Sequence, residues 1–219
     1  NSYGLEVTSG IILGLDTDSA DTEARLKAFI DASNVPILTI NLLQALPKTP
    51  LWDRLRRDGR VIADDTGLES NVRFLRPYDE VLATWRRCIA YAYTPERLFQ
   101  RFAHQVEATY ANRLIGSLRG KLSLNNLRLA LVLAFNIALR IGIFSDYRRS
   151  FWKAALRALR RGQIDGALGM GIVGHHLIHF SREALRGEQN ASFYSAQSRR
   201  SANAPQSGGA VPAKLRKSG

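Results

Sequence analysis

Residues 5–16 (LEVTSGIILGLD) alternate between two kinds of side chain, and this alternation restricts the fold more than any other feature. Read with a period of two, one side of the segment is apolar and the other is polar or bare. Glycine inside a strand usually marks the close approach of a ligand or of another backbone. The segment therefore predicts a strand with two unlike faces. One face holds Leu5, Val7, Ser9, Ile11, Leu13 and Leu15, and the other holds Glu6, Thr8, Gly10, Ile12, Gly14 and Asp16.

A helix and a second strand are expected directly after this segment. Asp18 or Ser19 can serve as the helix N-cap, and residues 35–43 (VPILTINLL) form the second strand. Strand, helix and strand within roughly 40 residues favour a right-handed crossover, so the two strands should be parallel. The inner stripe of the helix is expected to be Leu26, Phe29 and Ile30.

Apolar side chains at helical spacing dominate the rest of the chain. Helices are expected at 51–57, 79–93, 95–112, 126–144, 147–161 and 164–186. The helix at 147–161 should be amphipathic. Its apolar side holds Phe151, Trp152, Ala155, Leu156 and Leu159, and its other side holds Arg149, Lys153, Arg157, Arg160 and Arg161. Close packing is expected at Gly166, Gly169, Gly171 and Gly174.

The positive charge lies almost entirely in the second half of the chain. The formal net charge is +12. Residues 1–110 carry 13 Lys and Arg against 15 Asp and Glu, whereas residues 111–219 carry 18 against 4, a net of +14. This asymmetry indicates two parts with different partners, and an anionic surface is the first hypothesis for the second part.

The basic helices allow three interpretations. Peripheral contact with a membrane through residues 126–186 is favoured, because Arg and Lys opposite Trp, Phe and Leu suit a helix lying among lipid headgroups. A solvated basic face on a helical bundle is the second interpretation. Nucleic acid is the least favoured partner, because the basic residues lie opposite an apolar face and no known nucleic-acid motif is present.

Three side chains have a spacing that can hold a metal ion. His175, His179 and Glu183 are four residues apart on one predicted helical face. The pattern lacks an accompanying general base, so histidines packed at a helix interface are the better interpretation. We predict no metal site.

Most of the chain, about residues 3–195, also resembles a known enzyme family. The order of segments consists of the run Gly10–Gly14 (GIILG) on a strand, a crossover helix, and a strand that leads into LPKTPLWDRLRRDGR. It is similar to the end of the radical S-adenosylmethionine barrel, in its cobalamin-binding branch. The runs at 85–114 (WRRCIAYAYTPERLFQRFAHQVEATYANRL) and 175–195 (HHLIHFSREALRGEQNASFYS) resemble the hopanoid-methylating members of that branch. A dinucleotide-binding fold fits less well, because the glycines lie within the strand and the following turn is acidic.

The resemblance implies a cofactor site on the first strand. Gly10, Ile12 and Gly14 would face the adenosine of S-adenosylmethionine, and Asp18 matches the acidic position that closes the motif. Glu6 and Thr8 can hydrogen-bond a ligand on the same face. The alternative is that the glycines only make room for a neighbouring side chain.

The resemblance also implies cofactors that this chain holds only in part. Family members use a [4Fe–4S] cluster, S-adenosylmethionine and methylcobalamin to methylate carbon, here C-2 of a hopanoid lipid. The cluster-binding C-x-x-x-C-x-x-C motif and the cobalamin-binding domain have no counterpart in these residues, and Cys88 is the single cysteine. We therefore expect a C-terminal fragment that is inactive alone and that joins a missing N-terminal part. The alternative is a non-catalytic basic module that binds a membrane surface or nucleic acid.

The expected fold class is α/β followed by α. Residues 1–77 would form the end of a partial TIM-type barrel, 78–115 a helical extension, 116–194 a basic amphipathic helical region and 195–219 a disordered tail. The expected location is the cytoplasm, at the inner face of the cytoplasmic membrane.

Overall fold

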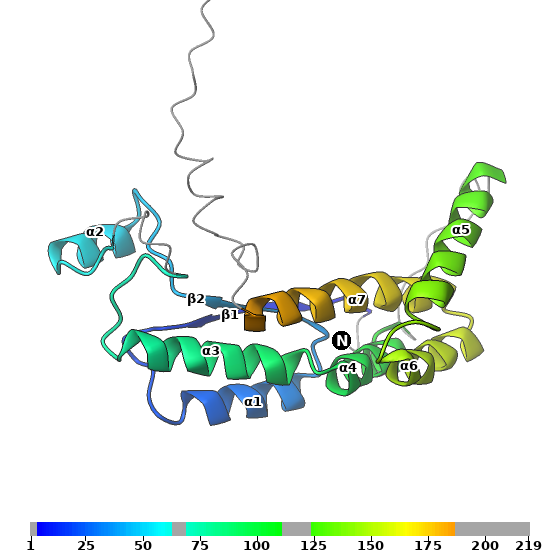
Figure 1. The fold of residues 1–219 in the computed structure, drawn as a ribbon, viewed down its shortest axis with the longest axis horizontal. Helices are drawn as coiled ribbons and strands as arrows, with labels where there is room; N and C mark the ends of the chain where they lie inside the picture. Colours follow the sequence, from blue (N-terminus) through cyan, green and yellow to red (C-terminus); the bar gives the residue numbers. More distant parts are fainter. Residues whose placement is uncertain (1–3, 63–68, 111–123, 187–219) are drawn as a thin grey trace, which may run out of the picture.

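The computed structural model describes residues 4–62, 69–110 and 124–186, and within them the chain forms one small sheet and seven helices (Figure 1). The predicted disordered tail at 195–219 lies outside these residues. In chain order the elements are β1 (Thr8–Leu13), α1 (Thr22–Ser33), β2 (Ile37–Leu42), α2 (Pro50–Arg57), α3 (Tyr78–Ala92), α4 (Pro95–Ala108), α5 (Leu124–Arg140), α6 (Arg148–Arg160) and α7 (Ile164–Arg186).

The two strands pair in parallel, as their connection by α1 predicts. Gly10 lies opposite Thr39, and Ile12 lies opposite Asn41. The alternation along β1 is confirmed, because Leu13 is buried whereas Ile12 is 50% exposed. The strand is shorter than the apolar pattern suggested. Leu5 and Val7, which the pattern assigns to the apolar face of the strand, precede the paired residues and are exposed.

Helix α1 begins later than expected. Its N-cap position is Asp21, not Asp18 or Ser19. The Asp18 carboxylate is instead bonded to backbone amides of the preceding turn, which leaves it unable to cap the helix. Leu26 and Ile30 are buried as predicted, but Phe29 is 44% exposed.

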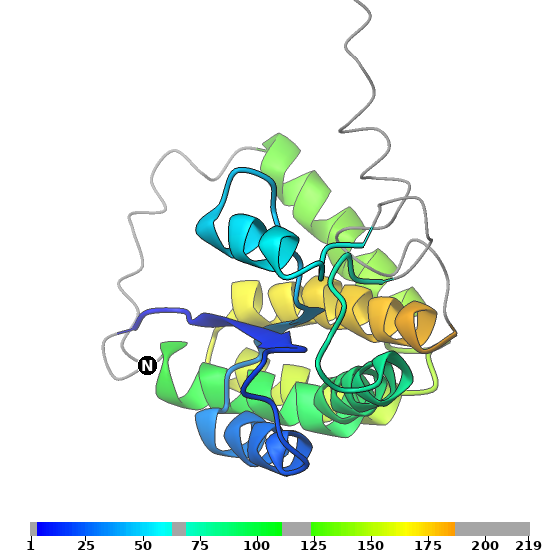
Figure 2. The same cartoon turned by 90° about the vertical axis from the view of Figure 1, so that its left-hand side faces the viewer.

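Helices α1 and α3 lie together on one side of the sheet (Figures 1 and 2). The indole Nε1 of Trp85 in α3 donates a hydrogen bond of 2.8 Å to the carbonyl of Ile40 in β2. Helix α3 also contacts α7, so it belongs to both halves of the molecule. The boundary predicted between residues 77 and 78 falls at the start of this helix, and the division into domains stays a prediction.

Helix α2 lies beyond the C-terminal ends of the strands (Figure 1). Pro50 occupies its first turn, where the missing N–H costs nothing. The hydroxyl of Thr49 caps the helix by accepting a hydrogen bond of 3.2 Å from the backbone N–H of Trp52. The chain leaves the helix through Gly59, whose φ of +65° lies in the left-handed region.

Helices α4, α6 and α7 pack around aromatic residues. Phe99 is 1% exposed, and its ring contacts the rings of Phe102, Tyr147 and Phe151. Gly174 of α7 faces Phe99 so closely that an added Cβ would lie 3.1 Å from the ring. The predicted close packing is thus confirmed at Gly174, and also at Gly166 and Gly171. It is wrong for Gly169, because nothing lies within 4 Å of a Cβ built there.

The inner face of α6 differs from the predicted one. Ala154 and Ala158 are buried together with Phe151 and Ala155. Leu156 and Leu159, which the pattern places on the apolar side of the helix, are 43% and 42% exposed. The small alanines allow α4 and α7 to approach this helix closely, and the larger leucines are left outside.

Candidate functional site at the open face of the sheet

One face of the sheet is left uncovered by α1 and α3. Thr8, Gly10 and Ile12 of β1 point to this open face, as predicted. Thr39 and Asn41 of β2 lie beside them, because the register pairs Gly10 with Thr39 and Ile12 with Asn41. Sequence reasoning did not select Thr39 and Asn41, although polar residues at alternate positions of an otherwise apolar strand gave the signal.

Gly10 leaves free space above the middle of the open face. A Cβ at this position would touch only the hydroxyl of Thr39, at 3.4 Å, which is an ordinary contact. No neighbouring side chain of the described structure fills the position. The alternative in which Gly10 makes room for a neighbour is therefore not supported by the packing, and the space is available to a ligand that approaches the backbone.

Gly14 has a different role from Gly10. It is buried just after the end of β1, with φ of +90°. A Cβ here would lie 2.4 Å from the ring of Phe74. The second glycine of the motif thus lets an aromatic side chain pack on the backbone, as the alternative interpretation proposed. Its contact with adenosine stays a prediction.

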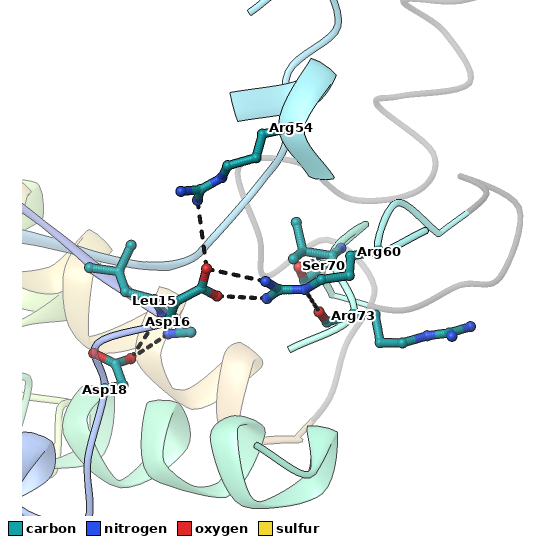
Figure 3. Close-up of polar contacts among 9 residues, drawn as sticks. Leu15, Asp16, Asp18, Arg54, Arg60, Ser70 and Arg73 are labelled. Atoms are coloured by element: carbon teal, nitrogen blue, oxygen red, sulfur yellow. Dashed lines mark hydrogen bonds and ion pairs between the residues drawn. The ribbon is translucent and has the colours of Figure 1, made fainter. Parts of the chain in front are cut away.

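Asp18 holds the turn that follows β1. Its Oδ2 accepts hydrogen bonds from the amides of Gly14, at 2.7 Å, and Leu15, at 3.1 Å (Figure 3). These two bonds fix the unusual backbone of Gly14 from within the same loop. Asp18 therefore shapes the end of the strand, and we describe it as a positioning residue.

Asp16 connects this turn to the segment after α2. Arg60 donates two hydrogen bonds to its carboxylate, at 2.6 and 3.1 Å, and Arg54 lies 3.6 Å away (Figure 3). The hydrogen bonds from Arg60 and its positive charge lower the pKa of Asp16, although partial burial opposes the shift. Sequence reasoning read the acidic turn only as unfavourable to phosphate. It missed this pair because 44 residues separate its members.

Arg60 is itself held in place by the backbone. Its Nε donates to the carbonyl of Arg73 at 2.9 Å, and a bridge between Val61 and Val72 lies next to it. The guanidinium is thus pre-oriented toward Asp16. A bidentate pair of this kind has a fixed direction as well as a charge.

A buried polar network fixes the chain as it leaves β2. Asn71 accepts from the amide of Ala45 and donates to its carbonyl, both at 2.8 Å. The hydroxyl of Ser70 donates to the carbonyl of Leu43 at 2.6 Å. Both strands of the sheet therefore end in segments that side chains hold rigidly.

Two other predicted site residues, Glu6 and Asp18, lie outside β1. Glu6 precedes β1 and is exposed. A hollow of about 410 Å³ lies between β1 and α1, and Asp18 is among the residues that line it.

Cys88 does not fit an iron–sulfur cluster. It is fully buried in α3, and burial raises the pKa of its thiol to about 11. A cluster ligand must be a thiolate, and a [4Fe–4S] cluster is held by several of them. The cluster cannot be built from this chain's one cysteine.

The histidines of α7 contact an aromatic side chain and one another. His175 Nδ1 is hydrogen-bonded to the hydroxyl of Tyr147, and the ring centroids of His175 and His179 are 4.3 Å apart. Burial, together with nearby cations, lowers the pKa of His175. Across the described residues, no three His, Cys, Asp or Glu side chains come together as a metal site.

The chain belongs to the family described as Domain of unknown function (DUF4070), whose model matches residues 49–190. The resemblance seen in the sequence motifs is confirmed by a particular relative. The chain is 52% identical over 202 residues, 92% of its length, to the Hopanoid C-2 methylase of Rhodopseudomonas palustris (strain TIE-1). It is 26% identical over 206 residues, 89% of its length, to Uncharacterized methyltransferase sll1242 of Synechocystis sp. (strain ATCC 27184 / PCC 6803 / Kazusa).

The chain spans 38% and 37% of the lengths of these two relatives. No solved structure matches it. Both relatives carry the names of methyltransferases, which does not favour the alternative of a non-catalytic module.

Proposed function

We propose that the chain is the C-terminal part of a radical S-adenosylmethionine methyltransferase that methylates a hopanoid lipid at C-2. The observation that carries the proposal is the 52% identity to a hopanoid C-2 methylase over 92% of the chain. The sheet of the described residues would then be the end of a larger barrel, and its open face would look into the barrel. A [4Fe–4S] cluster and cobalamin would be held by residues outside this chain and would supply the radical and methyl-transfer chemistry.

The residues of the open face fit S-adenosylmethionine. Gly10 allows a flat ring or a ribose to lie against the strand, and a bulky residue there would prevent this. Thr8, Thr39 and Asn41 offer hydroxyl and amide groups for hydrogen bonds on the same face. The chain's own contribution is to bind and orient the adenosine, while Asp18 and the Asp16–Arg60 pair keep the strand end in place.

The proposal is tested by placing a side chain in the space above Gly10. In the complete protein, Gly10→Val should lower the affinity for S-adenosylmethionine at least about tenfold, a change worth about 1.4 kcal/mol. Calorimetric titration measures this affinity, and mass spectrometry of the lipid measures methylated hopanoid. The melting temperature should change little, because the added Cβ meets only the Thr39 hydroxyl and β-branched residues suit a strand.

The matched control is Gly169→Ala in α7, where nothing lies within 4 Å of the new Cβ. It should leave both affinity and methylation unchanged. Unchanged S-adenosylmethionine affinity in Gly10→Val would contradict the assignment of the open face. Complete protein that binds S-adenosylmethionine but methylates no hopanoid would contradict the assignment of the substrate.

A further inference from the structure

Helix α5 is the part of the described structure whose large apolar side chains are most exposed. It contacts α7 and projects away from the other helices (Figure 1). Its C-terminal half is anchored by Ile137 and Ile141, which are 8% and 3% exposed. We define the α5 surface as six side chains that are 51–74% exposed: Leu129, Leu131, Val132, Phe135, Ile143 and Phe144.

The helical members of the α5 surface form one continuous strip. At about 100° per residue, Leu129, Leu131, Val132 and Phe135 fall within an arc of roughly 160°. Two described polar residues fall within this arc: Arg128, at the N-terminal end of the strip, and Asn136, which donates its side-chain amide to the carbonyl of Val132 at 2.8 Å. The hydrogen-bonding need of Asn136 is thus partly met inside the helix, which reduces the cost of placing it in an apolar environment.

The charges around the α5 surface are strongly positive. Residues 124–186 contain ten Arg and Lys against three Asp and Glu. Arg128 and Arg140 lie near the two ends of the strip, and both are exposed. Two further arginines, Arg148 and Arg149, follow the exposed Ile143 and Phe144 at the start of α6.

We propose that the α5 surface docks on an anionic lipid bilayer, with the apolar strip among the acyl chains and the arginines at the headgroups. Exposed apolar residues flanked by cations are the combination that holds a helix in a membrane interface. Each cation near an anionic leaflet adds to the attraction. Among the residues that the structure describes, no helix is long and apolar enough to cross a membrane.

Two other occupants fit less well. A second copy of this chain would bring two basic regions together, and like charges across an interface oppose association. The rest of the same protein is expected to join the free edge of β1, which is part of the sheet and not of the helices in contact with α5. The α5 surface is therefore left for a partner that is both apolar and anionic.

The test measures co-sedimentation of the complete protein with vesicles. Binding is expected to phosphatidylglycerol/phosphatidylcholine vesicles, and about tenfold less to vesicles of phosphatidylcholine alone. Leu131→Ser with Phe135→Ser should lower binding to the anionic vesicles at least about tenfold. The matched control is Leu46→Ser with Leu75→Ser, which removes two side chains that are 49% and 68% exposed elsewhere, and it should bind as the wild type does.

The other outcomes are decisive as well. The proposal would be overturned if the wild-type protein did not bind anionic vesicles. It would also be overturned if the Leu131→Ser, Phe135→Ser variant bound them as strongly as the wild type. If the α5 variant melts several degrees lower without vesicles, or changes the mass seen by light scattering, then protein covers α5 and the proposal is wrong. The docking does not depend on methyl transfer, so Gly10→Val protein should still bind vesicles.

Discussion

The sheet region and the helical region of this molecule are held together in different ways. Around the sheet, polar side chains fix irregular segments: Asp18 bonds the turn after β1, and Asn71 bonds the chain after β2. Among α4, α6 and α7, aromatic rings pack on one another and on glycine. The first arrangement defines where a few backbone atoms lie, whereas the second mainly supplies stability.

The two regions also leave different groups exposed. The open face of the sheet presents small and polar residues such as Gly10 and Thr39, and α5 presents large apolar ones such as Phe135. A small ligand that must approach a strand closely suits the first surface. An extended apolar surface suits the second. This difference supports our proposal that the two regions bind different partners, as the charge asymmetry of the sequence predicts.

The largest effect is expected from removing the centre of the aromatic packing. Phe99→Ala should lower the free energy of unfolding by about 3–5 kcal/mol, because it leaves a cavity among three other rings. Urea unfolding measures the change. Phe29→Ala is the control, and with a side chain that is 44% exposed it should cost at most about 1 kcal/mol. Equal losses of unfolding free energy in the two variants would show that the aromatic packing around Phe99 contributes no more to stability than an exposed ring does.

A smaller effect is expected from the glycine that carries Phe74. Gly14→Ala should lower the free energy of unfolding by about 3 kcal/mol, since it combines a positive φ with overpacking against the ring. Gly59→Ala has a positive φ but nothing within 4 Å, so it should cost about 1 kcal/mol. Shortening the ring with Phe74→Leu should recover part of the Gly14→Ala loss. No recovery would mean that backbone conformation alone accounts for the cost.

The smallest effect concerns the ion pair that joins the two strand-end loops. Asp16→Asn should lower the free energy of unfolding by at most about 1 kcal/mol at pH 7, because the pair is partly exposed. The pKa of Asp16 is lowered in the folded state, so the unfolded state binds more protons as the pH falls. The stabilisation is therefore present above the unfolded pKa of about 3.9 and is lost as the pH falls through the folded value.

The measurement compares urea unfolding of wild type and Asp16→Asn at pH 7 and near pH 3. The difference between the two proteins should shrink at the lower pH. Asp21→Asn is the control at pH 7, because it keeps a good N-cap residue at an exposed position and should leave the free energy of unfolding nearly unchanged. A difference that grew toward acid would show that Asp16 does not stabilise the folded state through its charge.

Much of the architecture could be predicted because it depends on local patterns. The alternation of β1 and its parallel pairing with β2 follow from residues 5–43, and α7 occupies the predicted range of 164–186. The same local patterns misjudged side chains at helix edges. Leu156 and Leu159 looked like core residues, but neighbouring helices pack on the smaller Ala154 and Ala158, a choice that only the tertiary structure makes.

The candidate site was predictable in part for a similar reason. Thr8, Gly10 and Ile12 could be grouped from the sequence because they share one strand face, and their contact with a ligand stays a prediction. The pair Asp16–Arg60 and the bonds from Ser70 and Asn71 were not found, because their partners are 26–44 residues away in irregular segments. Nothing in a periodic pattern marks such contacts. They arise where two loops meet after the strands and helices have packed.

The three tryptophans give each part of the molecule an optical reporter. Trp52 lies in α2 beyond the strand ends. Trp85 lies against the sheet, where its indole donates a hydrogen bond to the carbonyl of Ile40. Trp152 donates a hydrogen bond to the carbonyl of Gly142, next to α5. Replacing two of them by phenylalanine at a time would leave one fluorophore in a known place. The fluorescence emission of the three one-tryptophan variants would then report separately on ligand binding at the strand ends, on unfolding of the core and on contact with lipid.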